Sequence, residues 1–424
     1  MTQPQSTNRW SVVIGAILIQ FCLGSIYAWS VFTVPLKAAG WTKTDTQIVF
    51  SLELAVFALV MLYAGKLLTK YAPRYLVLAS GTLVGLGYLV AGLSGGTNFM
   101  AVTLSIGLIT GTGLGLGYVV PIAVCMRWFP DMKGLITGLA VAGFGLGATC
   151  WGLLAGTWPN FLGPQGIGIA STFMLYGVIF IVVVAIGSLF MKFPPDGWVP
   201  EGYVAPVASA TGASAAGASN FTISEMLGTT QFYLIFIVFT AGSAAGLSCI
   251  GLIKLYSIEQ LKLAGQLPAV ANGMAQFAMF VVFPICNAVG RIAWGTAGDK
   301  LGRKNSLLLM VAIQGLIVLA FPTLVSHELG LYLCAGVIGF NFGGNFALFP
   351  TITADTFGTK RVGQNYPVVF LAYGLGGILG PIIGGYMGDI GKSAQAFTGC
   401  GIILLVCAVL VTQIKPASKP QAAA

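Results

Sequence analysis

Charged residues are scarce in this chain of 424 residues, since Asp, Glu, Lys and Arg make up 7% of it, against about 25% in soluble proteins. That shortage excludes an ordinary water-soluble domain. Histidine occurs once, as His327, and the apolar segments contain no His/Asp/Glu cluster, Ser/His pair or phosphate-binding loop. An enzyme or a receptor is therefore disfavoured, and the chain is predicted not to be an enzyme.

Metal-binding patterns are missing as well. The eight cysteines lie inside apolar segments and lack the paired spacing of a zinc or disulfide site. We interpret them as small packing residues. No metal and no other cofactor is predicted.

Apolar residues are in excess, at 57%, with a mean hydropathy of +0.91. They form runs of roughly 20 residues, which as helices rising about 1.5 Å per residue cross a hydrocarbon core of about 30 Å. Residues 1–8 lack the basic start and the cleavage site of a signal peptide, so the first span is expected to remain as a helix. The sequence predicts an all-α integral membrane protein.

The apolar runs predict twelve transmembrane helices, six in each half of the chain. The expected spans are 11–35, 47–68, 75–94, 99–127, 134–158 and 168–191, followed by 231–255, 273–297, 306–325, 329–354, 365–388 and 396–414. The predicted domains are an N-terminal six-helix half at 1–191, a cytoplasmic linker at 192–230, a C-terminal six-helix half at 231–415 and a cytoplasmic tail at 416–424. An Ala/Ser/Gly tract without periodicity identifies the linker.

Basic residues set the expected orientation. With both termini in the cytoplasm, 14 of the 20 Lys and Arg residues fall on the inner side and five on the outer side, as the positive-inside rule requires. The net charge of +9 follows from this orientation, so no nucleic-acid partner is predicted. We expect a multi-pass protein of the cell (inner) membrane.

The two halves are related in sequence. Gly65, Lys70 and Arg74 match Gly295, Lys300 and Lys304 at a constant offset of 230, and residues 144–147 match 373–376 at an offset of 229. Duplicated six-helix halves are typical of carriers that hold substrate near the membrane midplane while the halves rock against each other. A channel would not need this duplication.

Residues 295–304, which read GTAGDKLGRK, resemble the G-x-x-x-D-[RK]-x-G-[RK]-[RK] loop of the major facilitator superfamily. An acid beside three cations at a helix end can connect neighbouring helix ends in one conformation and release them in another. We expect a conformational latch formed by Asp299, Lys300, Arg303 and Lys304. The alternative is a plain positive-inside loop. In the first-half copy Thr69 and Ala72 replace the expected Asp and Gly, so a latch there is expected to be weaker.

Residues 127–147, which read RWFPDMKGLITGLAVAGFGLG, resemble the loop and fifth helix of monocarboxylate transporters. They are still more similar to the oxalate/formate antiporter family of bacterial organic-anion carriers, as is GGNFALFP at 343–350. The resemblance covers the whole chain except the linker. It implies the major facilitator fold, with two pseudo-symmetric halves, and a small organic anion as substrate.

Away from the ends of the expected spans, two acid or base residues remain, Glu53 and Arg291, and a central charge costs about 2.5 to 3.5 kcal/mol on insertion scales. Arg291 is predicted to bind substrate, because its guanidinium stays protonated and offers a planar fork of donors to a carboxylate. Asn287 stands four residues earlier on the same helix face, where its amide can orient the guanidinium or the substrate, or else it is a satisfied core residue. Glu53 is a candidate coupling residue or an interfacial one.

The resemblance implies the remaining walls of the substrate site. They would be Tyr27, Tyr118, Tyr373, Phe342 and Phe346, which composition alone would assign to packing. Oxalate carriers have a Lys where Tyr373 stands, so the single cation favours a monoanion. Animal monocarboxylate carriers have an acid at the place of Asn287 and a Lys in the first helix, and both are absent here.

These features predict a secondary transporter of small monocarboxylates of the lactate, pyruvate, formate or acetate class, which works by alternating access with a proton as coupling partner. The alternative is an oxalate/formate-type organic-anion exchanger. The predicted partners are the carboxylate anion, the proton and the lipid bilayer. The protein is expected to be monomeric.

Overall fold

The computed structural model of the chain describes residues 9–156, 160–163, 165–195, 198–200 and 220–415. Within these ranges the regular structure is helical and contains no strand. The chain divides into two compact units: unit 1 comprises Met1–Asp131 and Leu139–Tyr203, and unit 2 comprises Met132–Gly138 and Val204–Ala424. The first residues of α8 (Lys133–Gly156) therefore belong to unit 2 and the rest of that helix to unit 1.

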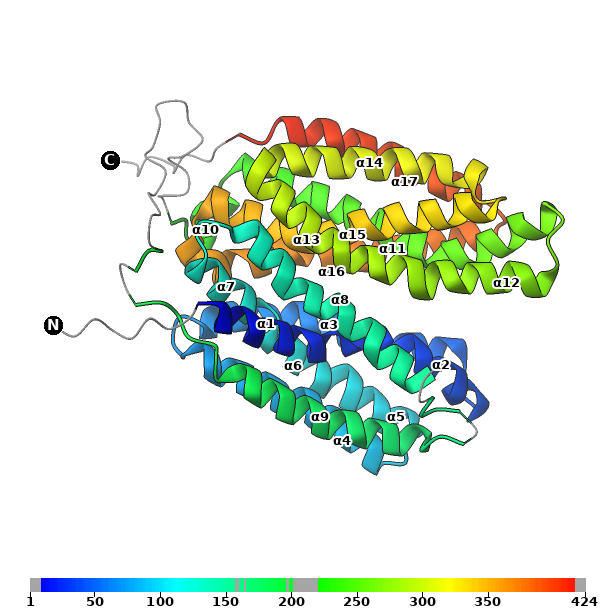
Figure 1. Cartoon of the computed structure of the whole chain (residues 1–424), viewed down its shortest axis with the longest axis horizontal. Helices are drawn as coiled ribbons and strands as arrows, with labels where there is room; N and C mark the ends of the chain where they lie inside the picture. The colour runs from blue at the N-terminus through cyan, green and yellow to red at the C-terminus, as the bar shows by residue number, and fades with distance from the viewer. Residues whose placement is uncertain (1–8, 157–159, 164, 196–197, 201–219, 416–424) are drawn as a thin grey trace. The chain divides into compact units, whose positions relative to one another are not determined.

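Unit 1 contains the helices of the first six predicted spans (Figure 1). A 3-10 segment divides the first span and a π-helical segment divides the fourth. Besides α8, its elements are α1 (Trp10–Leu23), η1 (Gly24–Ala28), α2 (Trp29–Ala38), α3 (Lys43–Leu67), α4 (Pro73–Leu93), α5 (Phe99–Val102), η2 (Thr103–Thr110), α6 (Gly111–Gly117), α7 (Val119–Trp128) and α9 (Gly168–Ser188).

Unit 2 contains the helices of the other six predicted spans, preceded by one short helix. A π-helical segment divides the second of these spans. The elements are α10 (Ile223–Leu227), α11 (Thr230–Leu263), α12 (Pro268–Phe277), η4 (Ala278–Val282), α13 (Phe283–Leu301), α14 (Arg303–Leu324), α15 (Glu328–Phe357), η5 (Thr359–Arg361), α16 (Val362–Asp389) and α17 (Ser393–Thr412).

The helix boundaries follow local side-chain chemistry. The Thr42 hydroxyl accepts from the backbone N–H of Asp45 while the Asp45 carboxylate accepts from that of Thr42, which forms a capping box at the start of α3. Pro73 opens α4, where its missing N–H is not needed. Between α13 and α14 the chain turns within one residue, because Gly302 adopts φ +84°, a value that side chains disfavour.

The predicted all-α membrane architecture is confirmed. Eleven helices in the described part of the chain are long and apolar enough to cross a membrane. The eighth predicted span is not among them; it comprises α12, η4 and α13 and contains the polar residues Asn287 and Arg291. It also begins at Pro268 rather than near 273, and α11 ends at Leu263 rather than near 255.

Parts of the predicted domain division lie outside the described residues, namely 196–197 and 201–219 of the linker and the whole tail at 416–424. The predicted domain boundaries therefore remain predictions.

Small residues bring the helices of each unit together. In unit 1, α4 and α9 lie side by side (Figure 1), and a β-carbon on Gly177 would press on the carbonyl oxygen of Gly85. In unit 2, a β-carbon on Gly380 of α16 would collide with the backbone of Ala244 in α11. Close packing of this kind fixes helix faces, and with them the buried polar residues described next.

Candidate functional site

Arg291 is a buried cation in the middle of α13. Its side chain is among the largest fully buried ones, with 1% of its surface exposed. The guanidinium Nε donates to Oδ1 of Asn287 at 3.1 Å, one helical turn earlier. Since a guanidinium removed from water needs directed acceptors, this bond fixes the orientation of the charged group.

Asn287 is itself held in place. Its Nδ2 donates to the backbone carbonyl of Gly339 in α15 at 3.3 Å, while its Oδ1 accepts from Arg291. Both ends of the amide are thereby engaged, so the predicted positioning geometry is present in the structure. The role of this pair in substrate binding remains a prediction.

An aromatic wall faces the guanidinium. The Cζ atom of Arg291 lies 4.4 Å from the ring centroid of Phe346, within the range of a cation–π contact. The Phe346 ring is 5.6 Å from that of Phe342 and 5.3 Å from that of Tyr373, both in edge-on geometry. The structure therefore brings all five predicted C-terminal residues into one cluster within unit 2, which we call the arginine cluster: Asn287, Arg291, Phe342, Phe346 and Tyr373.

Glycines on both sides of α13 hold Arg291 at a fixed depth. A β-carbon on Gly343 of α15 would collide with the carbonyl of Asn287, and one on Gly138 of α8 would collide with that of Arg291. The backbone around Arg291 is therefore packed on two faces by helices of unit 2. Such tight packing restricts movement of the guanidinium.

The two predicted N-terminal tyrosines share a ring contact in unit 1. Tyr27 of η1 and Tyr118, at the junction of α6 and α7, both meet Phe144 edge-on, at centroid distances of 5.5 and 5.4 Å. Tyr118 also packs edge-on against Phe57 of α3 at 5.3 Å. We call Tyr27, Tyr118 and Phe144 the tyrosine cluster.

Glu53 is buried within unit 1. It lies on α3 with 1% of its surface exposed. Both carboxyl oxygens are buried without a hydrogen-bond partner among the described residues. The coupling and interfacial interpretations of Glu53 both remain predictions.

A four-residue charge network surrounds the end of α13. Asp299 pairs with Arg303 at 2.5 Å, and its two carboxylate oxygens accept from the backbone N–H groups of Gly134 and Leu135 at 2.9 and 2.7 Å. The carboxylate therefore caps the first turn of α8, where helical N–H groups have no partner within their own helix.

Two members of this network were not predicted. Asp355 of α15 accepts from Arg303 Nε at 2.9 Å and pairs with Lys133 at 2.8 Å. The expected tenth span ends one residue before Asp355, and the expected latch does not include Lys133. We call Lys133, Asp299, Arg303 and Asp355 the α13 network; its formal charges cancel.

The other two predicted latch residues lie apart from this network. The Nζ of Lys304 donates to the carbonyl of Thr412 near the end of α17 at 2.5 Å, where a cation is favoured by the helix dipole. Lys300 is exposed at the end of α13. The sequence pattern could not separate these two lysines from Arg303.

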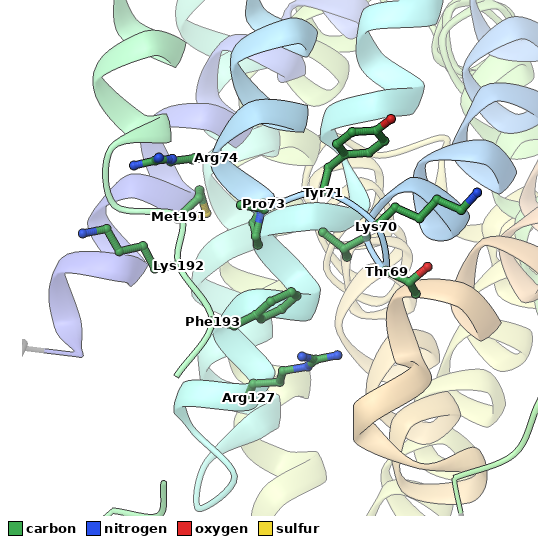
Figure 2. A pocket seen from close by; sticks show the side chains of 11 residues that line it. Thr69, Lys70, Tyr71, Pro73, Arg74, Arg127, Met191, Lys192 and Phe193 are labelled. Atoms are coloured by element: carbon green, nitrogen blue, oxygen red, sulfur yellow. The ribbon is translucent and has the colours of Figure 1, made fainter. Parts of the chain in front are cut away.

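The corresponding loop of unit 1 borders a cavity of about 650 Å³ (Figure 2). Four cations line it, and the described lining residues include no acid; the cations are Lys70, Arg74, Arg127 and Lys192. Arg127 stacks on the ring of Phe193 at 3.9 Å and Arg74 on that of Tyr75 at 4.6 Å. We call this cavity the cationic pocket.

Eleven helices of membrane-spanning length and polarity in the described part of the chain define a polytopic membrane protein, and Arg291 is a buried, oriented cation within it. The model of the Major Facilitator Superfamily matches residues 12–286 and 271–424. The chain belongs to this family, so it is a multi-pass membrane transporter with the predicted fold.

Three curated relatives match most of the chain. An Escherichia coli protein named uncharacterized MFS-type transporter YhjX is 29% identical over 88% of this chain and 86% of its own length. The oxalate:formate antiporter of Oxalobacter formigenes is 24% identical over 95% of this chain and 88% of its own. Apicoplast pyruvate carrier 1 of Toxoplasma gondii is 24% identical over 87% of this chain and 82% of its own.

Among solved structures, the fucose:proton symporter FucP of E. coli superposes with a TM-score of 0.68. It covers 96% of this chain and 100% of its own, at 14% identity. At that identity the match confirms the fold.

Proposed function

We propose that the chain is a secondary transporter of small monocarboxylates, of the lactate, pyruvate, formate or acetate class, with Arg291 as the group that binds the carboxylate. The observation that carries this proposal is the geometry of Arg291: buried, oriented by Asn287 and backed by Phe346. A desolvated guanidinium gains strongly from a carboxylate, since two parallel hydrogen bonds form where water no longer competes.

The composition of the arginine cluster favours a monoanion. Arg291 is the one cation among its five members, and Tyr373 contributes an apolar ring with a donor tip. A pyruvate carrier among the relatives supports this choice, whereas the relative named an oxalate:formate antiporter keeps the exchanger as the second candidate.

The remaining parts of the proposal concern the transport cycle. We infer that the protein is a monomer of the inner membrane with both termini in the cytoplasm, and that it works by alternating access. The tyrosine cluster would form further walls of the substrate site. A proton would be the coupling ion. The α13 network would act as the conformational latch, because its bonds to the first turn of α8 can form in one state and break in another. No enzymatic step is part of this cycle.

Arg291→Lys and Arg291→Ala test the proposal in purified protein and proteoliposomes. We expect both variants to lose carboxylate binding and uptake, because an ammonium replaces the bidentate fork with a point charge. Arg361→Lys, at an exposed arginine, is the matched control and should behave as wild type. Normal transport by Arg291→Ala would contradict the proposed site.

The same vesicles distinguish the two candidate functions. A labelled panel of formate, acetate, lactate, pyruvate and oxalate is offered to empty vesicles and to vesicles loaded with anion. Net uptake of monoanions supports the monocarboxylate transporter. Tight oxalate binding with lactate inert, and uptake confined to loaded vesicles, would support the exchanger.

A further inference from the structure

We propose that Glu53 is a proton-binding site that is coupled to the tyrosine cluster through η1 and Phe57. This inference deepens the proposed function and rests on it for the identity of the substrate, but the protonation of Glu53 can be measured separately.

The chemical argument begins with the carboxyl group itself. Glu53 is 1% exposed, and among the described residues neither carboxyl oxygen has a hydrogen-bond partner. An ionised carboxylate in that position would lose its hydration without compensation, whereas the neutral acid loses much less. The described conformation therefore favours Glu53 as the carboxylic acid, COOH, which holds one proton.

The groups that face Glu53 are weakly polar. Tyr88 of α4 is the titratable neighbour, and Ser25 of η1 lies beside Tyr88. The backbone of Gly111 in α6 packs against the backbone of Glu53. Tyr118, at the junction of α6 and α7, is a further titratable group; its ring contacts Phe57, one turn after Glu53 on α3. None of the ion pairs in the described part of the chain includes Glu53. A proton is therefore the cation that this site accommodates.

Two short connections join Glu53 to the tyrosine cluster. Phe57 stands one turn after Glu53 on α3 and contacts the ring of Tyr118. Ser25 and Tyr27 lie two residues apart on η1, the 3-10 segment that interrupts the first span. Short 3-10 stretches within helices often mark hinges, so a change of charge at Glu53 can move the residues that carry Tyr27 and Tyr118.

The proton balance of the cycle follows. Glu53 gains a proton as COO⁻ becomes COOH when the site is open to the acidic side, and it releases the proton on the other side. One proton and one monocarboxylate anion then cross together without net charge. Arg291 remains charged throughout.

Glu53→Gln tests this inference, because Gln copies the neutral acid in shape and cannot bind the proton. We expect the variant to fold, to exchange labelled for unlabelled substrate, and to lose the stimulation of uptake by a pH gradient. Glu259→Gln makes the same change at an exposed glutamate and should keep the stimulation. Stimulation that persists in Glu53→Gln would overturn the proposal.

Infrared spectroscopy of the purified protein provides the second measurement. The carbonyl stretch of a protonated carboxylic acid should be present in wild type at neutral pH and absent from Glu53→Gln, and present in Glu259→Gln. A spectrum of wild type without that band would overturn the proposal even if transport proceeds as described under the proposed function. Failure of Glu53→Gln to fold would also count against it, since an amide should replace a neutral acid without large loss of stability.

Discussion

The loop after α3 and the loop after α13 are two copies of one sequence pattern, at 65–74 and 295–304, yet they are stabilised in opposite ways. In the second copy, Asp299 bonds to the first turn of α8 and to Arg303. In the first copy, the hydroxyl of Thr69 turns back to the carbonyl of Lys66 in its own helix at 2.7 Å. At this position the side chain of the second copy therefore reaches another helix, whereas that of the first copy stays within its own helix.

The backbone reinforces the difference. Gly302 adopts φ +84° and joins α13 to α14 directly, so that Arg303 follows at once and returns to Asp299 one helical turn away. Its counterpart Ala72 has φ −62°, and Pro73 stands where Arg303 would be. The first copy thus lacks the acid, the turn and the arginine together.

The result is a contrast in charge balance. The α13 network contains two acids and two bases, whereas the described lining of the cationic pocket contains four bases and no acid. Aromatic faces contact two of these bases, since Arg74 stacks on Tyr75 and Arg127 on Phe193. The first copy of the loop pattern therefore borders a positively charged cavity, whereas the second belongs to a charge-balanced network.

The largest effect is expected for Asp299→Ala. The change removes the cap of α8 and one of the two acids that pair with Arg303. The side chains of Asp299 and Arg303 are largely buried, at 18% and 11% exposure. Together these losses should cost about 3 kcal/mol of stability. The midpoint temperature of thermal unfolding in detergent measures this loss. Asp299→Asn keeps one acceptor oxygen, so its midpoint should lie between those of wild type and Asp299→Ala. A midpoint equal to that of wild type in Asp299→Ala would show that the network contributes nothing.

An intermediate effect is expected for Lys133 and Asp355. Their side chains are 17% and 37% exposed, so solvent screens the pair. A double-mutant cycle of Lys133→Ala and Asp355→Ala should give a coupling energy of about 0.5 to 1 kcal/mol. Additive effects of the two substitutions would remove Lys133 from the network and leave Arg303 as the partner of Asp355.

The smallest effect is expected for Thr69→Asp, which places the missing acid in the first copy. Without the glycine turn and the arginine, the new carboxylate meets exposed lysines, so stability should change by less than about 0.5 kcal/mol. Thr69→Asn serves as the uncharged control in the same unfolding assay. If Thr69→Asp stabilised the protein as much as Asp299→Ala destabilises it, one acid would suffice and the turn would be irrelevant.

Sequence alone predicted the helices well, because each span is a long apolar run bounded by charges or turns. The expected bounds differ most where polar residues adjoin an apolar run, since α11 continues to Leu263 and the next helix begins at Pro268. Arg291 and Asn287 could be paired from helical spacing. Their contact with Phe346 depends on how α13 packs against α15, which no local pattern encodes.

The charge network shows the same limit. Asp299 and Arg303 are four residues apart, so their pairing is a local property of the sequence. Asp355 lies 52 residues from Arg303 and Lys133 lies 222 from Asp355. The tyrosine cluster could be named through family resemblance, while its joining ring, Phe144, came from the fold.

The connection between α13 and α14 consists of Gly302 alone, so this loop cannot accept inserted residues without moving Arg303. Surface loops usually accept inserted residues, and the segment from Leu68 to Ala72 in the first copy has five residues to absorb them. Between α13 and α14 an added residue would rotate Arg303 by about 100°, somewhat more than a quarter of a helical turn, and direct it away from both acids. Insertions, tags and natural length variation should therefore be tolerated after α3 and eliminated after α13.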